Sequence, residues 1–521
     1  MNDSESVFSK PIKIESGLIT GFAAGENKAV YVFKGIPYAA PPVGDLRWRE
    51  PQPVEAWEGV QAFTEFGFSC LQPEMPEPYG RDFGEQSEDC LYLNVWTGAK
   101  SQDAKLPVMV WIHGGGFYMG SATTDTYDGE VLARDGVVLV TINYRLGPFG
   151  FLAHPLLSKE SEHKVSGNYG LLDQIAALKW VKNNIASFGG DPDRVTIFGE
   201  SGGARSVCFL MVSPLAKGLF HRGIVQSGSL YRAIGHLTES RDGLPPMEEE
   251  GQRLAKKLGC KTLADFRKKP AIEILEAAEP KTAPLLSPPA PASTSDDNGL
   301  TAGPIIDGWV IPDDPVKLYR SGKQHDVPLI IGSNKDEASI FLRMFKSRAG
   351  GLARSVKFFF PKHHREVLPL YAEFGDNEFL AALNRFMTDA VWTRAARATA
   401  RDMAQVKSKV YLYFFTHHRL TSLGQFGSYH GIDIRYAFGH DLEANIPFTE
   451  EDHILSKKMR TYWTRFAATG DPNGPDLANW PPYDKDTDQC LELGSEIRVL
   501  THLRKEACDL FDRINEQRRS K

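Results

Sequence analysis

The chain has 521 residues, of which 42% are hydrophobic and 24% are charged, and its formal net charge is −6. This composition excludes a disordered or collagen-like chain, and the mildly acidic balance does not support nucleic-acid binding. Six cysteines are too few for a disulfide scaffold. Length alone favours three or four domains, although length is a soft guide to domain number.

The chain carries no visible targeting signal. Residues 1–6 are polar and acidic, without the basic and then apolar stretch of a signal peptide. No window approaches the 18 or so apolar residues of a membrane span. We therefore expect a soluble cytoplasmic protein without a membrane span, or a secreted or periplasmic one if a signal peptide had been removed.

Strand and helix patterns alternate through the middle of the chain. Residues 108–112 and 137–143 are short apolar runs typical of strands buried on both faces. Residues 171–188 place apolar side chains on one face of a helix. Further strands are predicted at residues 195–198, 329–331 and 410–415. This alternation predicts a mostly parallel sheet covered by helices, with the active site beyond the carboxyl ends of its strands.

The first chemical motif follows the predicted strand at 195–198. Residues 199–203 read Gly-Glu-Ser-Gly-Gly, which fits the G-x-S-x-G pattern of a nucleophile elbow, and residues 204–212 predict the helix that should come next. In such an elbow a sharp turn exposes the serine hydroxyl at the start of the helix. Ser201 is therefore the candidate nucleophile, and an ordinary glycine-rich turn is the alternative.

A glycine-rich loop follows the predicted strand at 108–112. Residues 113–117 read His-Gly-Gly-Gly-Phe, and successive glycines allow backbone N–H groups to converge on one oxygen. An oxyanion hole needs this arrangement. The alternatives are a flexible loop or a phosphate-binding turn, but no Gly-Lys-Ser/Thr follows.

A serine nucleophile needs a base and an acid that orients the base. In this type of fold the acid and then the histidine follow the serine along the chain. Asp336 and Glu337 both come soon after the strand at 329–331. Spacing does not choose between them, nor among the histidines that follow, which are His363, His364, His417, His418, His430, His440, His453 and His502.

Together with these two motifs, five further segments carry a family resemblance. They are residues 33–39 (FKGIPYA), 46–49 (LRWR), 88–94 (EDCLYLN), 143–150 (NYRLGPFG) and 188–192 (FGGDP). From about residue 32 to residue 480 the chain resembles the type-B carboxylesterase/lipase family of α/β-hydrolases, which includes cholinesterases and bacterial para-nitrobenzyl esterases.

The resemblance implies a triad of Ser201, Glu337 and His430. The family's acid lies in a pattern like G-x-N-x-x-E, which selects Glu337, and its histidine lies in H-G-x-D/E, which selects His430. The family usually has glycine after the acid, where this chain has Ala338.

The resemblance also implies oxyanion donors and a disulfide. The donors would be the N–H groups of Gly115, Gly116 and Gly202, and the family usually has alanine at the last position, so the elbow is expected to be looser here. Cys70 and Cys90 match the family's first disulfide, and in a reducing cytosol they would remain thiols.

The implied fold is a single α/β-hydrolase domain over residues 1–521, with cap or insertion regions at roughly 235–325 and 340–405. One of these regions contains residues 282–297, whose four prolines predict a loop or linker. The implied activity is two-step hydrolysis of a small-molecule carboxylic ester through an acyl-enzyme, with no metal and no cofactor. Whether the protein is a monomer or a homodimer stays open.

Several alternatives share this fold. The same triad would serve a hydrolase of carbamates, amides or specialised natural esters. Anionic esters are one such class, because residues 343–365 contain seven lysines and arginines and no aspartate or glutamate. A lipase and a non-catalytic adhesion module are the remaining alternatives, and the adhesion branch of the family lacks the nucleophile that Ser201 supplies.

Overall fold

The structure, a computed structural model, describes residues 7–74, 83–228, 230–241, 243–279, 303–342, 351–374, 378–418, 426–440 and 447–519. The loop predicted at residues 282–297 lies outside the described residues, as do Arg343, Lys346 and Arg348 of the basic segment. In the described part of the chain, no helix combines the length and apolar character needed to cross a membrane.

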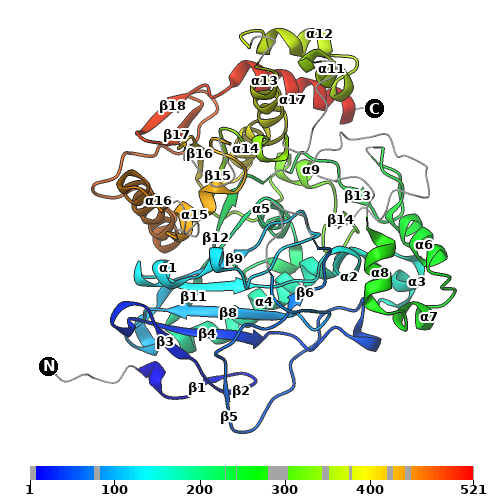
Figure 1. Ribbon diagram of the computed structural model, residues 1–521, viewed down its shortest axis with the longest axis vertical. Helices are drawn as coiled ribbons and strands as arrows, with labels where there is room; N and C mark the ends of the chain where they lie inside the picture. The colour runs from blue at the N-terminus through cyan, green and yellow to red at the C-terminus, as the bar shows by residue number, and fades with distance from the viewer. Residues whose placement is uncertain are drawn as a thin grey trace.

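A sheet of eleven strands runs through the described chain, in the order β18-β17-β16-β15-β12-β11-β9-β10-β8-β4-β3 (Figure 1). Neighbouring strands from β17 to β10 are parallel, and the pairs at both ends are antiparallel. The predicted α/β class with a mostly parallel sheet is confirmed. The strands are β3 Phe22–Ala24, β4 Val30–Pro37, β8 Tyr92–Thr97, β9 Leu106–Ile112, β10 Val138–Ile142, β11 Gly190–Glu200, β12 Arg222–Gln226, β15 Leu329–Asn334, β16 Val410–Phe415, β17 Gln489–Leu493 and β18 Ile497–Thr501.

The helices lie on both faces of this sheet and in the segments between its strands. They are α1 Glu130–Arg134, α2 Gly147–Phe151, α3 Pro155–Glu160, α4 Tyr169–Asn184, α5 Gly202–Leu210, α6 Met247–Lys257, α7 Leu263–Arg267, α8 Ala271–Ala278, α9 Pro315–Arg320, α10 Ser339–Leu342, α11 Gly351–Phe359, α12 His364–Val367, α13 Phe379–Thr388, α14 Arg394–Asp402, α15 Ile432–Phe438, α16 Glu450–Thr469 and α17 Lys505–Arg519. Short strands form three small sheets, from β1 Ile12–Ile14, β2 Gly17–Thr20 and β5 Val60–Ala62, from β6 Ser69–Cys70 and β7 Gln86–Ser87, and from β13 Gly235–His236 and β14 Ile305–Ile306.

Strand β9 illustrates why the central strands read as unbroken apolar runs. Val108 and Val110 pack into the core that contains α4 and α5, whereas Met109 and Trp111 pack into the core that contains α15 and α16. All four side chains are fully buried. Because successive strand residues point to opposite faces, a strand covered on both faces has no polar positions, as the sequence predicts for residues 108–112.

The helix predicted at residues 171–188 is α4, which begins at Tyr169 and is followed from Ile185 by a 3₁₀ turn. Helix α4 is buried on more than its apolar face, because polar residues on other faces are buried too. Asp173 is one of them, and its carboxylate accepts hydrogen bonds from the Nε and Nη2 atoms of the buried Arg145, at 2.8 and 2.7 Å. Pairing with an arginine lets the carboxylate be buried, and hydrophobic periodicity cannot reveal such a pair.

The two regions expected to be insertions contain mainly helices. The region at 235–325 includes α6, α7, α8 and α9, and the region at 340–405 includes α11 to α14. In Figure 1, α6, α7 and α8 lie together on the right, while α11, α12 and α13 lie at the top beside the C-terminal α17.

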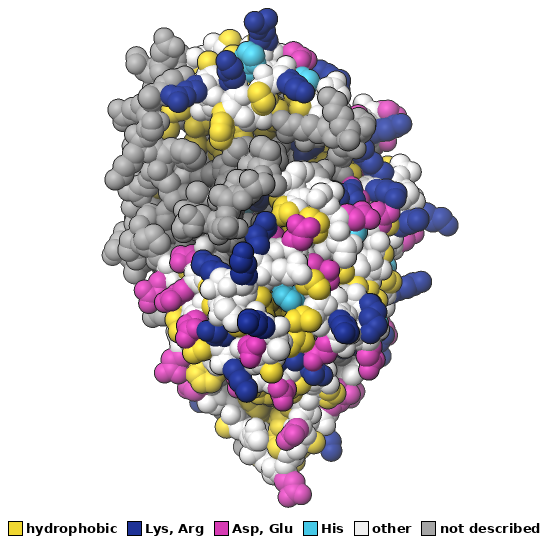
Figure 2. Space-filling view, turned by 90° about the vertical axis from the view of Figure 1, so that its right-hand side faces the viewer, with side chains coloured by type: hydrophobic (Ala, Val, Ile, Leu, Met, Phe, Trp, Pro, Cys, Tyr) yellow, Lys and Arg dark blue, Asp and Glu magenta, His cyan; other side chains and the backbone are white. Residues whose placement is uncertain are grey.

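The described part of the basic segment, residues 351–365, forms α11 and the start of α12 at the surface. Figure 2 shows basic and hydrophobic side chains together at the top of the molecule, where these helices lie. Phe358 is 65% exposed there, whereas Val356 and Phe360 point inward and are buried. The exposed basic residues are Arg354, Lys357, Lys362 and Arg365. Among the described residues, the segment therefore forms a solvated basic face above a buried apolar cluster.

Candidate active site

Ser201 lies at the junction between β11 and α5, the sharp turn predicted from the G-x-S-x-G pattern. Its backbone has φ 54° and ψ −115°, a conformation that costs free energy for a residue with a Cβ. The Ser201 N–H donates to the carbonyl of Gln226 at the end of β12, at 2.9 Å. Helix α5 begins at Gly202, so the serine is held between a strand end and a helix start.

The glycine at position 203 allows α5 to pack directly against β9. A Cβ on Gly203 would lie 1.9 Å from the carbonyl oxygen of Ile112 and 2.7 Å from that of His113. Both are backbone atoms, which cannot move aside without shifting the sheet. The G-x-S-x-G spacing is thus required by the close approach of helix and strand.

We expect Gly203→Ala to destabilise the fold by about 3 kcal/mol, because the added methyl overlaps backbone atoms of a close-packed core. Differential scanning calorimetry at a fixed scan rate should show a clearly lower unfolding temperature. Gly44→Ala is the control, since its Cβ would meet nothing within 4 Å and adds only the cost of a positive φ of 57°. Equal unfolding temperatures for the two variants would contradict this account of the packing.

The glycine loop after β9 lies against the elbow. Ideal Cβ atoms on Gly114 and Gly202 would lie 3.3 Å from the Ser201 Cβ and 3.0 Å from the Gly116 backbone nitrogen, respectively. Gly115 and Gly116 have φ values of 104° and 64°, which suit glycine and strain other residues. The structure therefore brings two of the predicted oxyanion residues, Gly116 and Gly202, together beside Ser201, and Gly115 precedes Gly116 in the same loop.

His113 fixes the start of this loop through contacts of its ring. Its Nδ1–H donates to the Gly114 carbonyl at 2.9 Å, and its ring stacks on Tyr144 with centroids 4.5 Å apart. Burial lowers the pKa of His113 to about 4, so the imidazole stays neutral near pH 7.

His430 lies against Glu337, as the family pattern implies. The His430 Nδ1 is 2.5 Å from the Glu337 Oε2. The other oxygen, Oε1, accepts hydrogen bonds from the Ser227 hydroxyl at 2.6 Å and from the Asn334 N–H at 2.7 Å. Glu337 is fully buried, and these three contacts fix the orientation of its carboxylate.

The neighbouring acid is directed elsewhere. Asp336 accepts hydrogen bonds from the Asn384 side chain at 2.8 Å and from the Ser428 N–H at 3.1 Å. Among the other candidate histidines, His417 pairs with Asp452. His440 pairs with the carbonyl of Asp128, His363 with Glu366 and His502 with Asp488. Spacing along the chain could not separate these histidines from His430, because the choice depends on which loop faces the elbow.

Asp433 joins three strands of the sheet beneath the site. Its carboxylate accepts hydrogen bonds from Gln226 at the end of β12, Asn334 at the end of β15, and Tyr413 in β16, at 2.8, 3.1 and 3.0 Å. Asp433 comes three residues after His430, so this network holds the histidine loop in register with the sheet. The acid of the H-G-x-D pattern is thus a positioning residue.

Glu200, the residue before the nucleophile, was not singled out by sequence reasoning. Its Oε1 lies 3.1 Å from the His430 Nε2. Burial alone would lower the pKa of His430, but the carboxylates of Glu200 and Glu337 outweigh it and raise that pKa to about 9. The only sequence signal for Glu200 was its place inside the elbow motif.

The raised pKa of His430 predicts that the activity increases toward alkaline pH. A general base must be neutral, so kcat/KM for the free enzyme should fall about tenfold per pH unit below a pKa of about 9. Glu200→Gln removes one of the two charges that favour the imidazolium, and the acid limb should move to lower pH. Measuring kcat/KM from pH 5 to 10 tests this, with the exposed Glu249→Gln as control. If the acid limb of the profile lies at the same pH in Glu200→Gln as in the wild type, Glu200 is not a cause of the raised pKa of His430.

Cys70 and Cys90 form a disulfide in the structure, with Cα atoms 5.0 Å apart. The other four cysteines, Cys208, Cys260, Cys490 and Cys508, are free thiols. Burial raises the pKa of the Cys208 thiol on α5 to about 12, as expected of an unreactive core residue.

Comparison with known proteins assigns the chain to one family. A family model described as the carboxylesterase family matches residues 9–511. The chain is 36% identical over 485 residues to the para-nitrobenzyl esterase of Bacillus subtilis, covering 91% of this chain and 93% of that protein. It is 34% identical over 490 residues to the fumonisin B1 esterase of Sphingopyxis macrogoltabida, covering 92% and 86%. A solved structure titled PNB esterase superposes with a TM-score of 0.79 at 33% identity, covering 96% of this chain and 99% of that one.

Proposed function

The chain belongs to the carboxylesterase family and is a carboxylic ester hydrolase, and from this premise we propose that Ser201, His430 and Glu337 carry out its reaction. The observation that best supports this assignment is the position of His430. Its Nδ1 contacts Glu337, and its Nε2 lies beside Glu200 at the elbow that carries Ser201. A base held in this way lies beside the elbow whose serine it would deprotonate.

The reaction proceeds in two steps. The Ser201 Oγ attacks the ester carbonyl carbon while His430 Nε2 takes the hydroxyl proton, and the N–H groups of Gly115, Gly116 and Gly202 stabilise the oxyanion. The carbon–oxygen bond to the alcohol then breaks, and His430 returns its proton to the departing oxygen. Water, deprotonated by His430, attacks the carbonyl carbon of the acyl-enzyme. The bond from that carbon to the Ser201 Oγ breaks, His430 returns the proton to Oγ, and the acid is released. Glu337 holds the imidazole and stabilises its charged form.

A matched substrate panel tests the reaction class. We expect 4-nitrophenyl butyrate to be hydrolysed much faster than the corresponding 4-nitroanilide, because a phenoxide leaves more readily than an anilide nitrogen. It should also be hydrolysed faster than a 4-nitrophenyl carbamate, because the carbamate nitrogen donates its lone pair to the carbonyl and slows attack on the substrate and on the carbamoyl-enzyme. Faster cleavage of the anilide or the carbamate would favour the alternative reaction. A sharp rise in rate above the solubility limit of a long-chain ester would indicate a lipase.

A further inference from the structure

A turn of π-helix interrupts the helical run between α13 and α14. The turn covers Asp389–Thr393, and the residues that flank it on both sides keep helical dihedral angles, so the run continues without a break. Within the turn the Arg394 N–H donates to the carbonyl of Asp389, five residues earlier, whereas an α-helix bonds four residues back. Such a turn adds one residue to the helix and is frequent at functional sites.

The two ends of this turn contact the loop that carries Glu337, one on each side of the acid. The Ala338 N–H, directly after the acid, donates to the Thr388 Oγ1 at 3.3 Å. The hydroxyls of Thr393 and Ser333 lie 3.1 Å apart, and Ser333 belongs to β15, four residues before the acid. Both threonines are fully buried. One helical turn therefore supports the acid loop before and after its carboxylate.

The extra residue of the turn explains why both threonines face the acid loop. In an α-helix five residues rotate by about 500°, so residues five apart lie about 140° apart around the axis. In a π turn the hydrogen bonds join residues five apart, which brings Thr388 and Thr393 to nearly the same side. A regular α-helix through this segment would turn one of the two hydroxyls away from the loop.

The same turn also contacts the base. The centre of the Trp392 ring lies 5.4 Å from that of the His430 imidazole. Trp392 stacks parallel to the Phe341 ring at 5.9 Å, and Phe341 in turn lies 5.2 Å from the imidazole. Both aromatic side chains are buried, so they limit how far the imidazole can tilt away from the acid.

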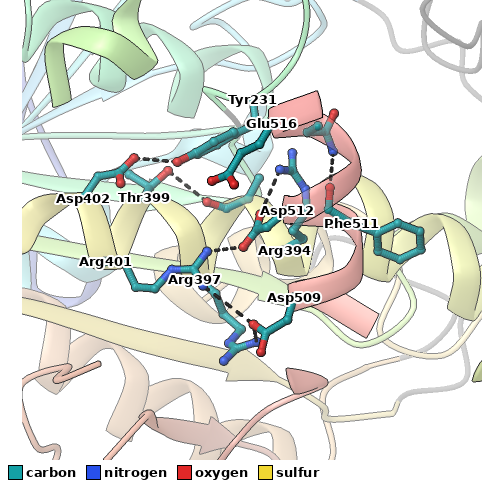
Figure 3. Close-up of polar contacts among 12 residues, drawn as sticks. Tyr231, Arg394, Arg397, Thr399, Arg401, Asp402, Asp509, Phe511, Asp512 and Glu516 are labelled. Atoms are coloured by element: carbon teal, nitrogen blue, oxygen red, sulfur yellow. Dashed lines mark hydrogen bonds and ion pairs between the residues drawn. The ribbon is translucent and has the colours of Figure 1, made fainter. Parts of the chain in front are cut away.

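Ion pairs fix the turn and the helix that follows it. Asp389 is buried, and its carboxylate pairs with Arg385 and Arg504, at 3.4 and 3.8 Å. Figure 3 shows α14 fastened to the C-terminal α17, where Arg394 pairs with Asp512 at 3.1 Å. A support fixed in this way suits an active site, because catalytic groups work only within about 0.5 Å of their productive geometry.

We propose that residues 388–393, here called the π turn, position Glu337 and His430 for the reaction. Thr388 and Thr393 hold the loop of the acid from both sides, and the tryptophan of the turn holds the ring of the base. This inference rests on the proposed function of the triad. The two threonine hydroxyls are buried against the acid loop, so their loss should affect the alignment of the catalytic groups and hardly affect substrate binding.

The test replaces each threonine with valine, which keeps the shape and removes the hydroxyl. We expect Thr388→Val and Thr393→Val to lower kcat for 4-nitrophenyl butyrate by about 10- to 30-fold, because a misplacement of about 1 Å costs up to about 100-fold. KM should change less than about twofold, and serine at either position should restore most of kcat.

Thr399→Val is the matched control. Thr399 lies on α14 and is equally buried, but its hydroxyl donates to the Ala395 carbonyl of the same helix, at 2.9 Å (Figure 3). We expect this variant to lose a similar amount of stability and to keep the wild-type kcat. The comparison separates the alignment of the acid from a general loss of stability.

A double-mutant cycle shows whether the effect passes through the acid. Once Glu337→Gln has removed the carboxylate, adding Thr393→Val should lower kcat by less than about twofold more, because no acid is left to align. The tryptophan is tested with 4-nitrophenyl acetate, whose acyl group is small. Trp392→Leu should lower its kcat about tenfold, and Trp392→Phe, which keeps a ring against the imidazole, should retain most of it.

Four results would overturn the inference: wild-type kcat in both valine variants, the same kcat loss in Thr399→Val, a loss that multiplies in full with Glu337→Gln, or wild-type kcat in Trp392→Leu. If the valine variants do not fold, Ser333→Ala removes the hydrogen bond of Thr393 from its other end. Wild-type kcat in Ser333→Ala would then exclude the π turn as a support. Near-normal kcat in Glu337→Gln contradicts the proposed function, whereas wild-type kcat in the threonine variants contradicts this inference alone.

Discussion

Replacing Ser201 with alanine is expected to lower kcat for 4-nitrophenyl butyrate by roughly 10⁴- to 10⁶-fold. The variant loses the Oγ that forms the acyl-enzyme, and neither His430 nor Glu337 carries a hydroxyl that could replace it. The residual rate would come from the oxyanion donors and from substrate binding.

The same substitution should leave the fold intact. Both serine and alanine carry a Cβ and meet the same strain at φ 54°, so the unfolding temperature should change little. A fluorophosphonate provides a second readout, since the Ser201 Oγ displaces fluoride from phosphorus and the protein gains the mass of one phosphonyl group. Ser201→Ala should show no such gain, and Ser240→Ala, at an exposed position, should show the wild-type gain. Near-normal activity in Ser201→Ala would reject the assignment.

Replacing Glu337 with glutamine is expected to lower kcat near neutral pH by about 10⁴-fold. The glutamine oxygen can still accept the hydrogen bonds from Ser227 and Asn334, so its NH₂ group must face the Nδ1 of His430. An NH₂ group donates, which makes Nδ1 the acceptor and places the ring proton on Nε2. A protonated Nε2 cannot accept the proton of Ser201, so the base is lost while the packing is kept.

Asp336→Asn is the matched control for this variant. The two acids are adjacent in the chain, and both are buried or partly buried, but Asp336 contacts Asn384 and Ser428. We expect Asp336→Asn to change kcat by less than about tenfold, the size of an indirect effect, with any further cost appearing in stability. A larger kcat loss in Asp336→Asn than in Glu337→Gln would mean that the acid has been assigned to the wrong residue.

Sequence patterns predicted the sheet better than the helices. The apolar runs at 108–112 and 410–415 became β9 and β16, because a strand covered on both faces must be apolar throughout. Periodicity suggested one buried face for α4, whereas Asp173 and Gln174 are buried as well. Ion pairing with Arg145 makes the burial of Asp173 tolerable, and such a partner lies 28 residues away, beyond the reach of any local pattern.

For the site, sequence patterns alone identified the candidate nucleophile after β11 and the candidate oxyanion loop after β9. The G-x-S-x-G motif and the glycine run after β9 are both visible in the sequence. The positive φ at Gly115 and Gly116 is a local property of the loop. The carbonyl that lies 1.9 Å from an ideal Cβ on Gly203 belongs to Ile112 on β9, so that steric reason comes from the packing of α5 on the sheet. The family pattern then selected Glu337 and His430 among many acids and histidines. Spacing along the chain by itself could not make this choice.

The tertiary structure alone decided which groups meet. Parallel strands end at the same edge of the sheet, so the loops after β11, β15 and β16 converge, although Ser201 and His430 are 229 positions apart by their numbers in the chain. That convergence brings Glu200 within 3.1 Å of His430. Charges act through space, and their effect on a pKa depends on distance and burial, neither of which can be read along the chain.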